Sequence, residues 1–298
     1  MYPQTFEYFV PDSLEDAIRM LASYGEEAKV LAGGQSLIPL MKLRLARPRR
    51  LIDIGRLRGL AYVQEDESGL RVGALTSHAS VLESPLIQQR FPLVTDAVGA
   101  IGDNQVRNWG TIGGALAEAD PAGDWGPVAL ALKARIRCVS HRGERVLNAE
   151  SFFVDAYTTL LDADELITEV IFPTPAPDQY GAYVKLERRA GDFAVVSVGV
   201  QLAIDEKKVC HAASIALGAA GLTSIQAPDA ALFLTGKEIG PESIQEAAQR
   251  VAAAAEPLGD IRGSRQYKRA ALQSIFKHAV AVALRRSNGE TIRGGHVS

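Results

Sequence analysis

The segment from Lys29 to Pro48 reads KVLAGGQSLIPLMKLRLARP, in which a short apolar run enters two adjacent glycines. A strand that reaches a glycine pair can turn sharply there, because glycine adopts backbone conformations that other residues avoid. The sequence RRLIDIG predicts a second strand after the turn, and LEDAIRMLASYG predicts a helix before it. Asp12 or Ser13 can cap that helix, and Gly25 can end it. The N-terminal part of the chain therefore predicts a small α+β unit.

The middle of the chain alternates strand and helix patterns around a long glycine-rich segment. LRVGALT, from Leu70 to Thr76, predicts a strand. Residues 78–101 are expected to be helical, with breaks at Pro85 and Pro92. Residues 102–127 are rich in glycine, small residues and aspartate, which predicts a binding loop, because loops of such length are usually functional. Helix and strand patterns resume in VALALKARIRCVS and EVIFP.

The last third of the chain shows strands first and helices afterwards. The proline cluster PTPAPDQYG, from Pro173 to Gly181, is the best candidate for a domain boundary. Beyond it, AYVKLERR, FAVVSVGVQLAID and VCHAASIALGAAG alternate apolar with small or polar residues, as strands do. Alanine-rich helices are expected near Ser224–Leu234, Pro241–Ala255 and Tyr267–Arg286. This order predicts an α+β domain, a sheet with helices on one face.

Composition narrows the class of protein. The net charge of −3 gives no general attraction to nucleic acid or to an anionic membrane. The sequence that follows Met1, YPQTFEYFVPDS, is unlike a secretory signal, and no apolar run is long enough to cross a membrane, so we expect a cytoplasmic protein.

Residue usage argues against a metal centre or a catalytic acid–base pair on this chain. Two cysteines, Cys138 and Cys210, are too few for an iron–sulfur cluster held by four thiolates, and the five histidines form no ligand spacing. GxGxxG, GxxxxGK[ST] and GxSxG are all absent. No carboxylate pair stands isolated in an apolar setting, so no catalytic residue is assigned.

The positive indications of function come from two glycine-bearing segments. In Ala32–Ser36, glycines would let backbone N–H groups approach a phosphate closely, although a tight turn with polar tips is the simpler interpretation of this segment taken alone. Thr111–Gly114 repeats the combination of a hydroxyl and two glycines, and the two segments could clasp the phosphates of one dinucleotide. Asp124 could accept hydrogen bonds from sugar hydroxyls. Asp120 and Asp124 could instead cap the helix expected near Trp125.

Four motifs in order carry a resemblance to a known family. LAGGQSLIPLMKLRLARPRRLIDI, GTIGG, DPAGDWGP and KLERRAGDFAVVSVGV together resemble the FAD-binding medium subunit of the molybdenum hydroxylases, in its carbon monoxide dehydrogenase type. Xanthine dehydrogenase carries the same module within a longer chain. The resemblance runs from Phe6 to about Arg286, and RGSRQYKRAAL fits the family's C-terminal domain. Each motif alone is weak, whereas the set with matching spacing is specific.

The resemblance implies an α+β fold in three units. Residues 1–56 and 57–175 would form two α+β subdomains of an FAD-binding domain of the vanillyl-alcohol-oxidase type, with FAD between them. Residues 176–298 would form a C-terminal α+β domain, a sheet flanked by helices.

The resemblance also implies which residues contact FAD. Those expected to hold the pyrophosphate and adjoining groups are Ala32, Gly33, Gly34, Gln35, Ser36, Thr111, Ile112, Gly113 and Gly114. Asp124 would bind sugar or ribityl hydroxyls, Lys185 would lie near the ring or the ribityl chain, and Ile101 and Ile167 would contact flavin or adenine. Two positions depart from the pattern, because Gln35 replaces a frequent histidine, and Phe193 a tyrosine often found beside the ring. Phenylalanine keeps the stacking area without the hydroxyl.

The implied function is electron transfer within a larger enzyme. A large molybdenum subunit would hydroxylate the substrate, and a small subunit with two [2Fe–2S] clusters would relay the electrons to FAD on this chain, in an assembly of two heterotrimers. The FAD would pass them to a quinone, NAD or dioxygen. Two other functions stay open, a self-sufficient FAD-dependent oxidoreductase with the same domain and a flavin-free scaffold. The intact glycine pairs and Asp124 argue against the scaffold.

Overall fold

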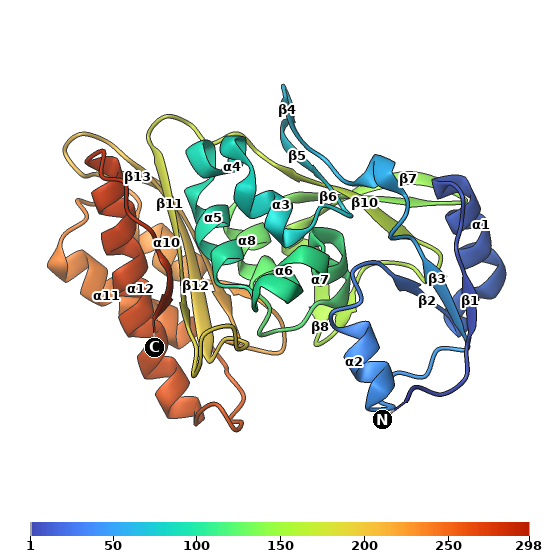
Figure 1. Cartoon of the computed structure of the whole chain (residues 1–298). Helices are drawn as coiled ribbons and strands as arrows, with labels where there is room; N and C mark the ends of the chain where they lie inside the picture. Colours follow the sequence, from blue (N-terminus) through green and yellow to red (C-terminus); the bar gives the residue numbers. More distant parts are fainter. Residues whose placement is uncertain (1, 298) are drawn as a thin grey trace.

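The computed structural model describes residues 2–297 and has the predicted mixed α+β architecture (Figure 1). The three larger sheets follow one another across the molecule, with helices between the second and third, and β8 and β9 form a small two-stranded sheet. The small N-terminal sheet lies at one end, and the C-terminal helices α11 and α12 lie at the other. The C-terminal α-helices pack on the sheet formed by the strands that precede them, as the sequence order predicted.

The N-terminal sheet is parallel, in the order β1-β3-β2. Ser13 caps α1 by accepting a hydrogen bond from the backbone N–H of Asp16, and Gly25 ends the helix with a φ of 52°. The predicted helix and its caps are therefore confirmed, whereas the strand β1 was not predicted. The elements are β1 (Glu7–Phe9), α1 (Leu14–Tyr24), the 3-10 turn η1 (Gly25–Glu27), β2 (Ala28–Leu31), α2 (Leu37–Lys42), β3 (Arg50–Asp53) and the 3-10 turn η2 (Arg58–Leu60).

The second sheet is antiparallel, in the order β4-β5-β10-β6-β7. One face shares a hydrophobic core with α3, α4, α5, α7 and α8. The helical region breaks at Pro85 and Pro92 as predicted, since each proline begins a new helix. The elements are β4 (Val63–Asp66), β5 (Gly69–Gly73), α3 (His78–Glu83), α4 (Pro85–Arg90), α5 (Pro92–Gly99), α6 (Asn104–Trp109), α7 (Ile112–Glu118), α8 (Trp125–Ala131), β6 (Arg135–Ser140), β7 (Gly143–Asn148), α9 (Ala149–Phe152), β8 (Phe153–Asp155), β9 (Thr158–Thr159) and β10 (Leu166–Phe172).

Residues 102–127 are not the long loop that the composition predicted. The segment folds into α6, α7 and the first turn of α8. Side chains of Asp103 and Thr111 cap α6 and α7 by accepting hydrogen bonds from Val106 N–H and Gly114 N–H. Gly113 lies inside a helix because the helix packs closely on the sheet, where a Cβ on it would come within 2.8 Å of the Ala74 carbonyl oxygen. The glycines of residues 102–127 therefore serve close packing as well as turns.

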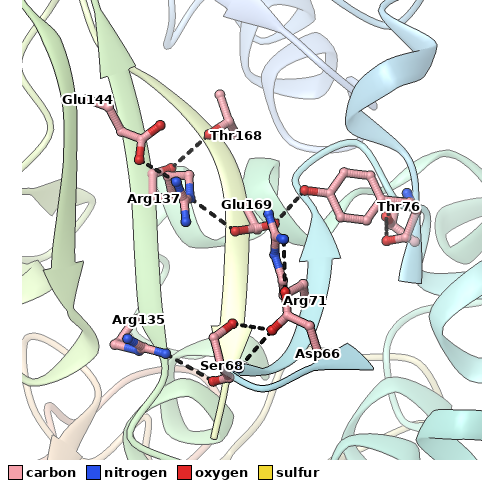
Figure 2. Close-up of polar contacts among 10 residues, drawn as sticks. Asp66, Ser68, Arg71, Thr76, Arg135, Arg137, Glu144, Thr168 and Glu169 are labelled. Atoms are coloured by element: carbon pink, nitrogen blue, oxygen red, sulfur yellow. Dashed lines mark hydrogen bonds and ion pairs between the residues drawn. The ribbon is translucent and has the colours of Figure 1, made fainter. Parts of the chain in front are cut away.

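The outer face of the second sheet carries a polar network centred on Glu169 (Figure 2). Glu169 is 1% exposed and accepts hydrogen bonds from Arg71 Nε at 2.6 Å, Arg137 Nε at 3.0 Å and the Tyr62 hydroxyl at 2.6 Å. Burial, together with the bond to Glu169, raises the pKa of Tyr62 to about 12. Because Arg71 and Arg137 come from the strands on either side of β10, the carboxylate ties three strands together.

The C-terminal sheet, in the order β14-β13-β12-β11-β15, is covered on both faces. Helices α10, α11 and α12 share a core with one face, as predicted. The other face packs on α5 and α8 of the preceding segment, which sequence periodicity did not reveal. The elements are β11 (Gln179–Leu186), β12 (Val196–Ile204), β13 (Cys210–Gly218), β14 (Ile225–Gln226), α10 (Pro228–Leu234), α11 (Pro241–Ala254), α12 (Arg265–Ser287) and β15 (Gly295–Val297).

Candidate functional site

The first glycine segment, Ala32–Ser36, connects β2 to α2 and presents free backbone N–H groups. Gly34 has a φ of +73°, a conformation that side chains disfavour. Among residues 2–297, the N–H groups of residues 33–36 donate to no carbonyl or side chain. Consecutive unpaired N–H groups around a left-handed residue form a concavity that binds anions. Gln35 contributes to the turn itself, because its side-chain amide donates to the Gly33 carbonyl at 3.3 Å.

The second segment, Thr111–Gly114, uses its N–H groups differently. Ile112 N–H donates to the Thr76 carbonyl at 3.2 Å, and Gly113 N–H to the Ala74 carbonyl at 2.9 Å. Gly114 N–H donates to the Thr111 hydroxyl oxygen at 3.2 Å. Ile112 and Gly113 N–H therefore anchor the segment to the residues that follow β5, and Gly114 N–H is used within the segment itself. None of the three N–H groups is free for a ligand, contrary to the expectation that both segments offer backbone donors. The Thr111 hydroxyl hydrogen is the donor that this segment keeps.

The fold brings the two segments into contact. A Cβ on Gly33 would lie 2.0 Å from the Trp109 carbonyl oxygen, so only glycine allows the first segment to approach the end of α6 this closely. A Cβ on Gly114 would lie 3.7 Å from the Cβ of Ala32. The Ser36 hydroxyl donates a hydrogen bond to Glu118 at the end of α7, and burial raises the pKa of that carboxyl. Residues far apart in sequence thus form one continuous surface.

Asp124 belongs to a second cluster, a buried ion pair. Its carboxylate accepts hydrogen bonds from the Tyr183 hydroxyl at 2.6 Å and from Lys185 Nζ at 3.2 Å. Asp124 stands at the N-cap position of α8, but its side chain makes no capping hydrogen bond, so the capping interpretation is wrong. Burial raises the pKa of Asp124, although Lys185 and Tyr183 oppose that shift. Lys185 is 1% exposed and also donates to the Ala100 carbonyl at 3.0 Å.

Glu187 extends this cluster along β11 towards the loop that carries Phe193. Its Oε2 atom lies 3.6 Å from Lys185 Nζ and accepts no hydrogen bond from the described part of the chain. Its Oε1 atom accepts a hydrogen bond from Gly191 N–H at 3.4 Å. A Cβ on Gly191 would lie 2.9 Å from the Gly102 carbonyl oxygen. The loop therefore packs beside the segment that contains Ile101.

The apolar residues predicted at the site have unequal exposure. Ile112 and Ile167 lie in the core, with exposed fractions of 0% and 6%. Ile101 is partly buried against that core. Phe193 is 45% exposed, and the Arg262 guanidinium lies 5.9 Å from its ring centroid. Ile101 and Phe193 are therefore the apolar side chains with surface left to contact a ligand.

Sequence reasoning missed the polar partners of the predicted residues. Tyr183 and Glu187 hold Asp124 and Lys185, and Glu118 meets Ser36. The pattern YVKLE contained a signal, because Tyr183 and Lys185 of β11 and Glu187 directly after it alternate with apolar residues and so face the same side. Glu118 had no comparable signal, since its role depends on the contact between distant segments.

These two clusters suit a ligand with both anionic and hydroxyl groups. Comparison with known proteins shows the family to which the chain belongs. The family model described as "FAD binding domain in molybdopterin dehydrogenase" matches residues 4–175. The chain belongs to the FAD-binding medium subunits of molybdenum hydroxylases. A second family model, "CO dehydrogenase flavoprotein C-terminal domain", matches residues 181–283.

Relatives match almost end to end. The carbon monoxide dehydrogenase medium chain of Hydrogenophaga pseudoflava is 38% identical over 283 residues, 95% of this chain and 98% of the relative. The nicotine 6-hydroxylase medium subunit of Paenarthrobacter nicotinovorans is 37% identical, covering 93% of this chain and 96% of the relative. A solved carbon monoxide dehydrogenase of Hydrogenophaga pseudoflava superposes with a TM-score of 0.93 at 38% identity, over 96% of this chain and 99% of that one. The resemblance inferred from the motifs is therefore confirmed.

Membership in the family settles the class of protein. The chain carries an FAD-binding domain and is an oxidoreductase subunit. Among residues 2–297, no helix has both the length and the apolar composition that a membrane span requires. Within the same residues, no group of three or more His, Cys, Asp or Glu side chains is placed to hold a metal ion.

Proposed function

We propose that this chain is the electron-transfer subunit of a molybdenum hydroxylase, and that its FAD receives electrons from [2Fe–2S] clusters on a small partner and passes them to an external acceptor. The observation that carries the proposal is the contact between the two glycine segments, with unpaired N–H groups on Gly33–Ser36. The names of the relatives, medium chain and medium subunit, support a place in a larger complex. A small and a large partner subunit, assembled as two heterotrimers, are part of the proposal.

The arrangement gives each segment a distinct role in holding FAD. The N–H groups of Gly33, Gly34, Gln35 and Ser36 would bind the pyrophosphate, since a row of free donors suits an anion. Thr111 would add its hydroxyl, and Gly114 would leave space for the phosphates. The buried N–H groups of Ile112 and Gly113 would hold this second segment in place rather than touch the cofactor.

The second cluster would hold the flavin end. Asp124 has lone pairs left beyond its bonds to Tyr183 and Lys185, and these would accept hydrogen bonds from ribityl or ribose hydroxyls. Lys185, Ile101 and Phe193 would lie beside the ring, with Ile167 behind them in the core. We further propose that residues 1–56, 57–175 and 176–298 are the structural units that enclose the cofactor.

The chemistry of this function needs no acid or base from the chain. Bound flavin supplies the redox change, accepting electrons singly or in pairs. The residues of this chain position the ring, exclude water from its buried side, and place the Lys185 charge close to it.

Reconstitution tests the proposal. The purified chain mixed with FAD should bind one flavin and show its oxidised absorbance, but substrates of molybdenum hydroxylases should not bleach it. When the chain is co-expressed with the large and small partner subunits, its flavin should be reduced by the substrate of the large subunit. A chain that takes up no FAD would contradict the proposal. Reduction by an organic substrate in the isolated chain would favour the self-sufficient oxidoreductase instead.

A further inference from the structure

Ser36 joins the first glycine segment to the end of α7 through its side chain. It stands at the N-cap position of α2, where a serine hydroxyl ordinarily accepts a hydrogen bond from the helix backbone, but its side chain makes no such bond. The hydroxyl instead donates to the Glu118 carboxylate. Ser36 N–H belongs to the row of unpaired N–H groups proposed to bind the pyrophosphate. The same residue therefore belongs to the proposed phosphate site and contacts a carboxylate.

A carboxylate is an unfavourable neighbour for an anion site. Glu118 is partly buried, and burial raises the pKa of its carboxyl, while the bond from Ser36 opposes that shift and the charge of Asp120 adds to it. Among the described side chains, no lysine or arginine forms an ion pair with Glu118 to offset its charge. An ionised Glu118 would repel a pyrophosphate bound at Ser36, because charges interact more strongly where little water separates them. The site therefore sets two anions against each other.

The elements packed around α7 bring few other charges to Glu118. Besides Asp120, the titratable group that faces it is Tyr157, from the loop between β8 and β9. Strands β5 and β10 pack on α7, but their charged residues, Arg71 and Glu169, bind each other on the outer face of the sheet (Figure 2). Helix α8 and strand β9 also pack on α7 and contain no titratable residue. Glu118 is the member of this group that touches the phosphate-binding segment.

The Ser36 hydroxyl has only one hydrogen to share between two acceptors. While Glu118 is ionised, that hydrogen goes to the carboxylate, and the hydroxyl oxygen has only lone pairs to offer a phosphate. When Glu118 is protonated, its carboxylic acid can donate to Ser36 Oγ, and Ser36 can donate to a phosphate oxygen. A proton on Glu118 thus removes the repelling charge and frees one more donor for the ligand.

We propose that FAD binding is coupled to the uptake of one proton from solvent by Glu118, so that Ser36 donates its hydroxyl hydrogen to the pyrophosphate; this inference rests on the proposed function. Glu118 is a positioning residue, since it acts on FAD through Ser36. The pyrophosphate stays ionised at neutral pH, so its arrival raises the pKa of Glu118 further. As the pH rises from the pKa of Glu118 in the free chain to that in the complex, FAD binds progressively more weakly.

Titration with FAD at several pH values tests the coupling. The full chain, alone or assembled with its partner subunits, is freed of FAD, and the Kd is measured from flavin fluorescence between pH 6 and pH 8. The Kd should rise with pH by up to about tenfold per pH unit, the limit for one coupled proton. Calorimetry in two buffers that differ in ionisation enthalpy should show the uptake of up to one proton per FAD.

Two variants separate the roles of the carboxyl and the hydroxyl. Glu118→Gln imitates the protonated acid, because its amide can donate to Ser36, and should bind FAD at least fivefold more tightly than the natural chain at pH 8, with no pH dependence and no proton uptake. Ser36→Ala should raise the Kd more at pH 6 than at pH 8, because the hydroxyl serves the phosphate when Glu118 is protonated. The matched control, Glu150→Gln, changes an exposed glutamate of α9 and should keep the natural pH dependence.

The outcomes distinguish this inference from the proposed function. Tight FAD binding that is equal at every pH, without proton uptake, would overturn the inference alone. A Glu118→Gln variant that kept the natural pH dependence would also overturn it, since another group would then take up the proton. So would a variant that bound FAD more weakly at every pH, since Glu118 would then serve only the fold. A chain that bound no FAD at any pH would overturn the proposed function, and this inference with it.

Discussion

Asp124 is a buried residue of the fold that we also propose as part of the FAD site. Its buried carboxylate is the direct partner of Lys185 and Tyr183. Asp124→Ala should lower the free energy of unfolding by about 3 kcal/mol, because it leaves the buried Lys185 ammonium with only the more distant Glu187 as a charged partner. Urea denaturation without added FAD measures this loss. Asp178→Asn, at an exposed position, should change stability by less than about 0.5 kcal/mol, and an equal loss in both variants would contradict the assignment.

Glycine is required at position 33 because the segment Ala32–Ser36 lies very close to the end of α6. Gly33→Ala would place a Cβ 2.0 Å from the Trp109 carbonyl oxygen, so the two segments must separate. The FAD content of the purified variant, read from the ratio of flavin to protein absorbance, should fall sharply. Gly59→Ala provides the control, since a Cβ there meets no atom within 4 Å. Full flavin in Gly33→Ala would show that the contact between the segments is unnecessary for binding.

His78 makes stability depend on pH. Burial, with a smaller effect of Arg107, lowers the pKa of His78 to about 4 from the usual 6.5, and Trp125 Nε1–H donates to its Nδ1 at 3.2 Å. Below pH 6.5 the unfolded chain takes up a proton that the folded chain accepts only near pH 4, so stability falls as the pH falls through this window. The loss from this group should be about 3 kcal/mol.

Chemical denaturation between pH 7 and pH 4 tests the contribution of His78. His78→Gln should be less stable than the natural chain at pH 7, because it disturbs a buried site, but its stability should decline less steeply towards pH 4. Parallel curves for the two proteins would mean that other groups cause the pH dependence. This role could not be predicted from the sequence, since a lone histidine reveals neither its burial nor its partner.

Among the elements, β10 depends most visibly on a side-chain network. Glu169 joins β10 to both neighbouring strands through Arg71 and Arg137 (Figure 2). Glu169→Ala should cost about 1–3 kcal/mol of unfolding free energy, a range that allows for the partial exposure of both arginines. Glu144→Ala removes a carboxylate that is 47% exposed and also pairs with Arg137, and should cost less than about 1 kcal/mol. Comparable losses in thermal or urea unfolding would rule out a special role for Glu169.

Local chemistry made some elements predictable and left others hidden. A capping residue or a proline affects only the adjacent helical turn, so its effect can be predicted locally. The helix boundaries predicted from Ser13, Gly25, Pro85 and Pro92 are correct. The short strand β1 escaped prediction because three residues carry too little periodicity, and its partner β3 lies more than forty positions away. The helices α6 and α7 were not predicted, because the glycines that suggested a loop, such as Gly110 and Gly113, are instead needed for close packing.

At the scale of the molecule, the order of motifs was enough to identify the family. The proposed FAD site also depends on contacts between residues that are far apart in the sequence. The sequence indicated both glycine segments and Asp124, whereas the ion pair with Lys185 joins residues 61 positions apart. The packing of α5 and α8 on the C-terminal sheet likewise depends on tertiary contacts that no local pattern encodes. This packing places the segment matched by the FAD-binding family model directly against the C-terminal one.

One buried ion pair fastens these two segments together. Arg286 of α12 donates to both carboxylate oxygens of Asp96 in α5, each at 2.8 Å, and also to the Gly181 carbonyl at 2.6 Å. The Asp96 side chain is 0% exposed and accepts a further hydrogen bond from Gly294 N–H at 2.9 Å. Arg286→Leu should therefore lower the free energy of unfolding by about 3–5 kcal/mol, because it leaves a buried carboxylate without its cation.

The same variant should reveal whether the segments unfold together. Both tryptophans, Trp109 and Trp125, lie in the first segment, so their fluorescence reports mainly on that segment, whereas far-ultraviolet circular dichroism reports on both segments. Urea curves from the two probes should coincide in the natural chain and separate in Arg286→Leu, because the lost ion pair weakens coupling more than either core. Arg285→Leu is the matched control, since the neighbouring arginine is 57% exposed and pairs with Glu290 at the surface. If the two variants gave the same stability and the same coincident curves, the C-terminal sheet would be held to α5 by apolar packing alone.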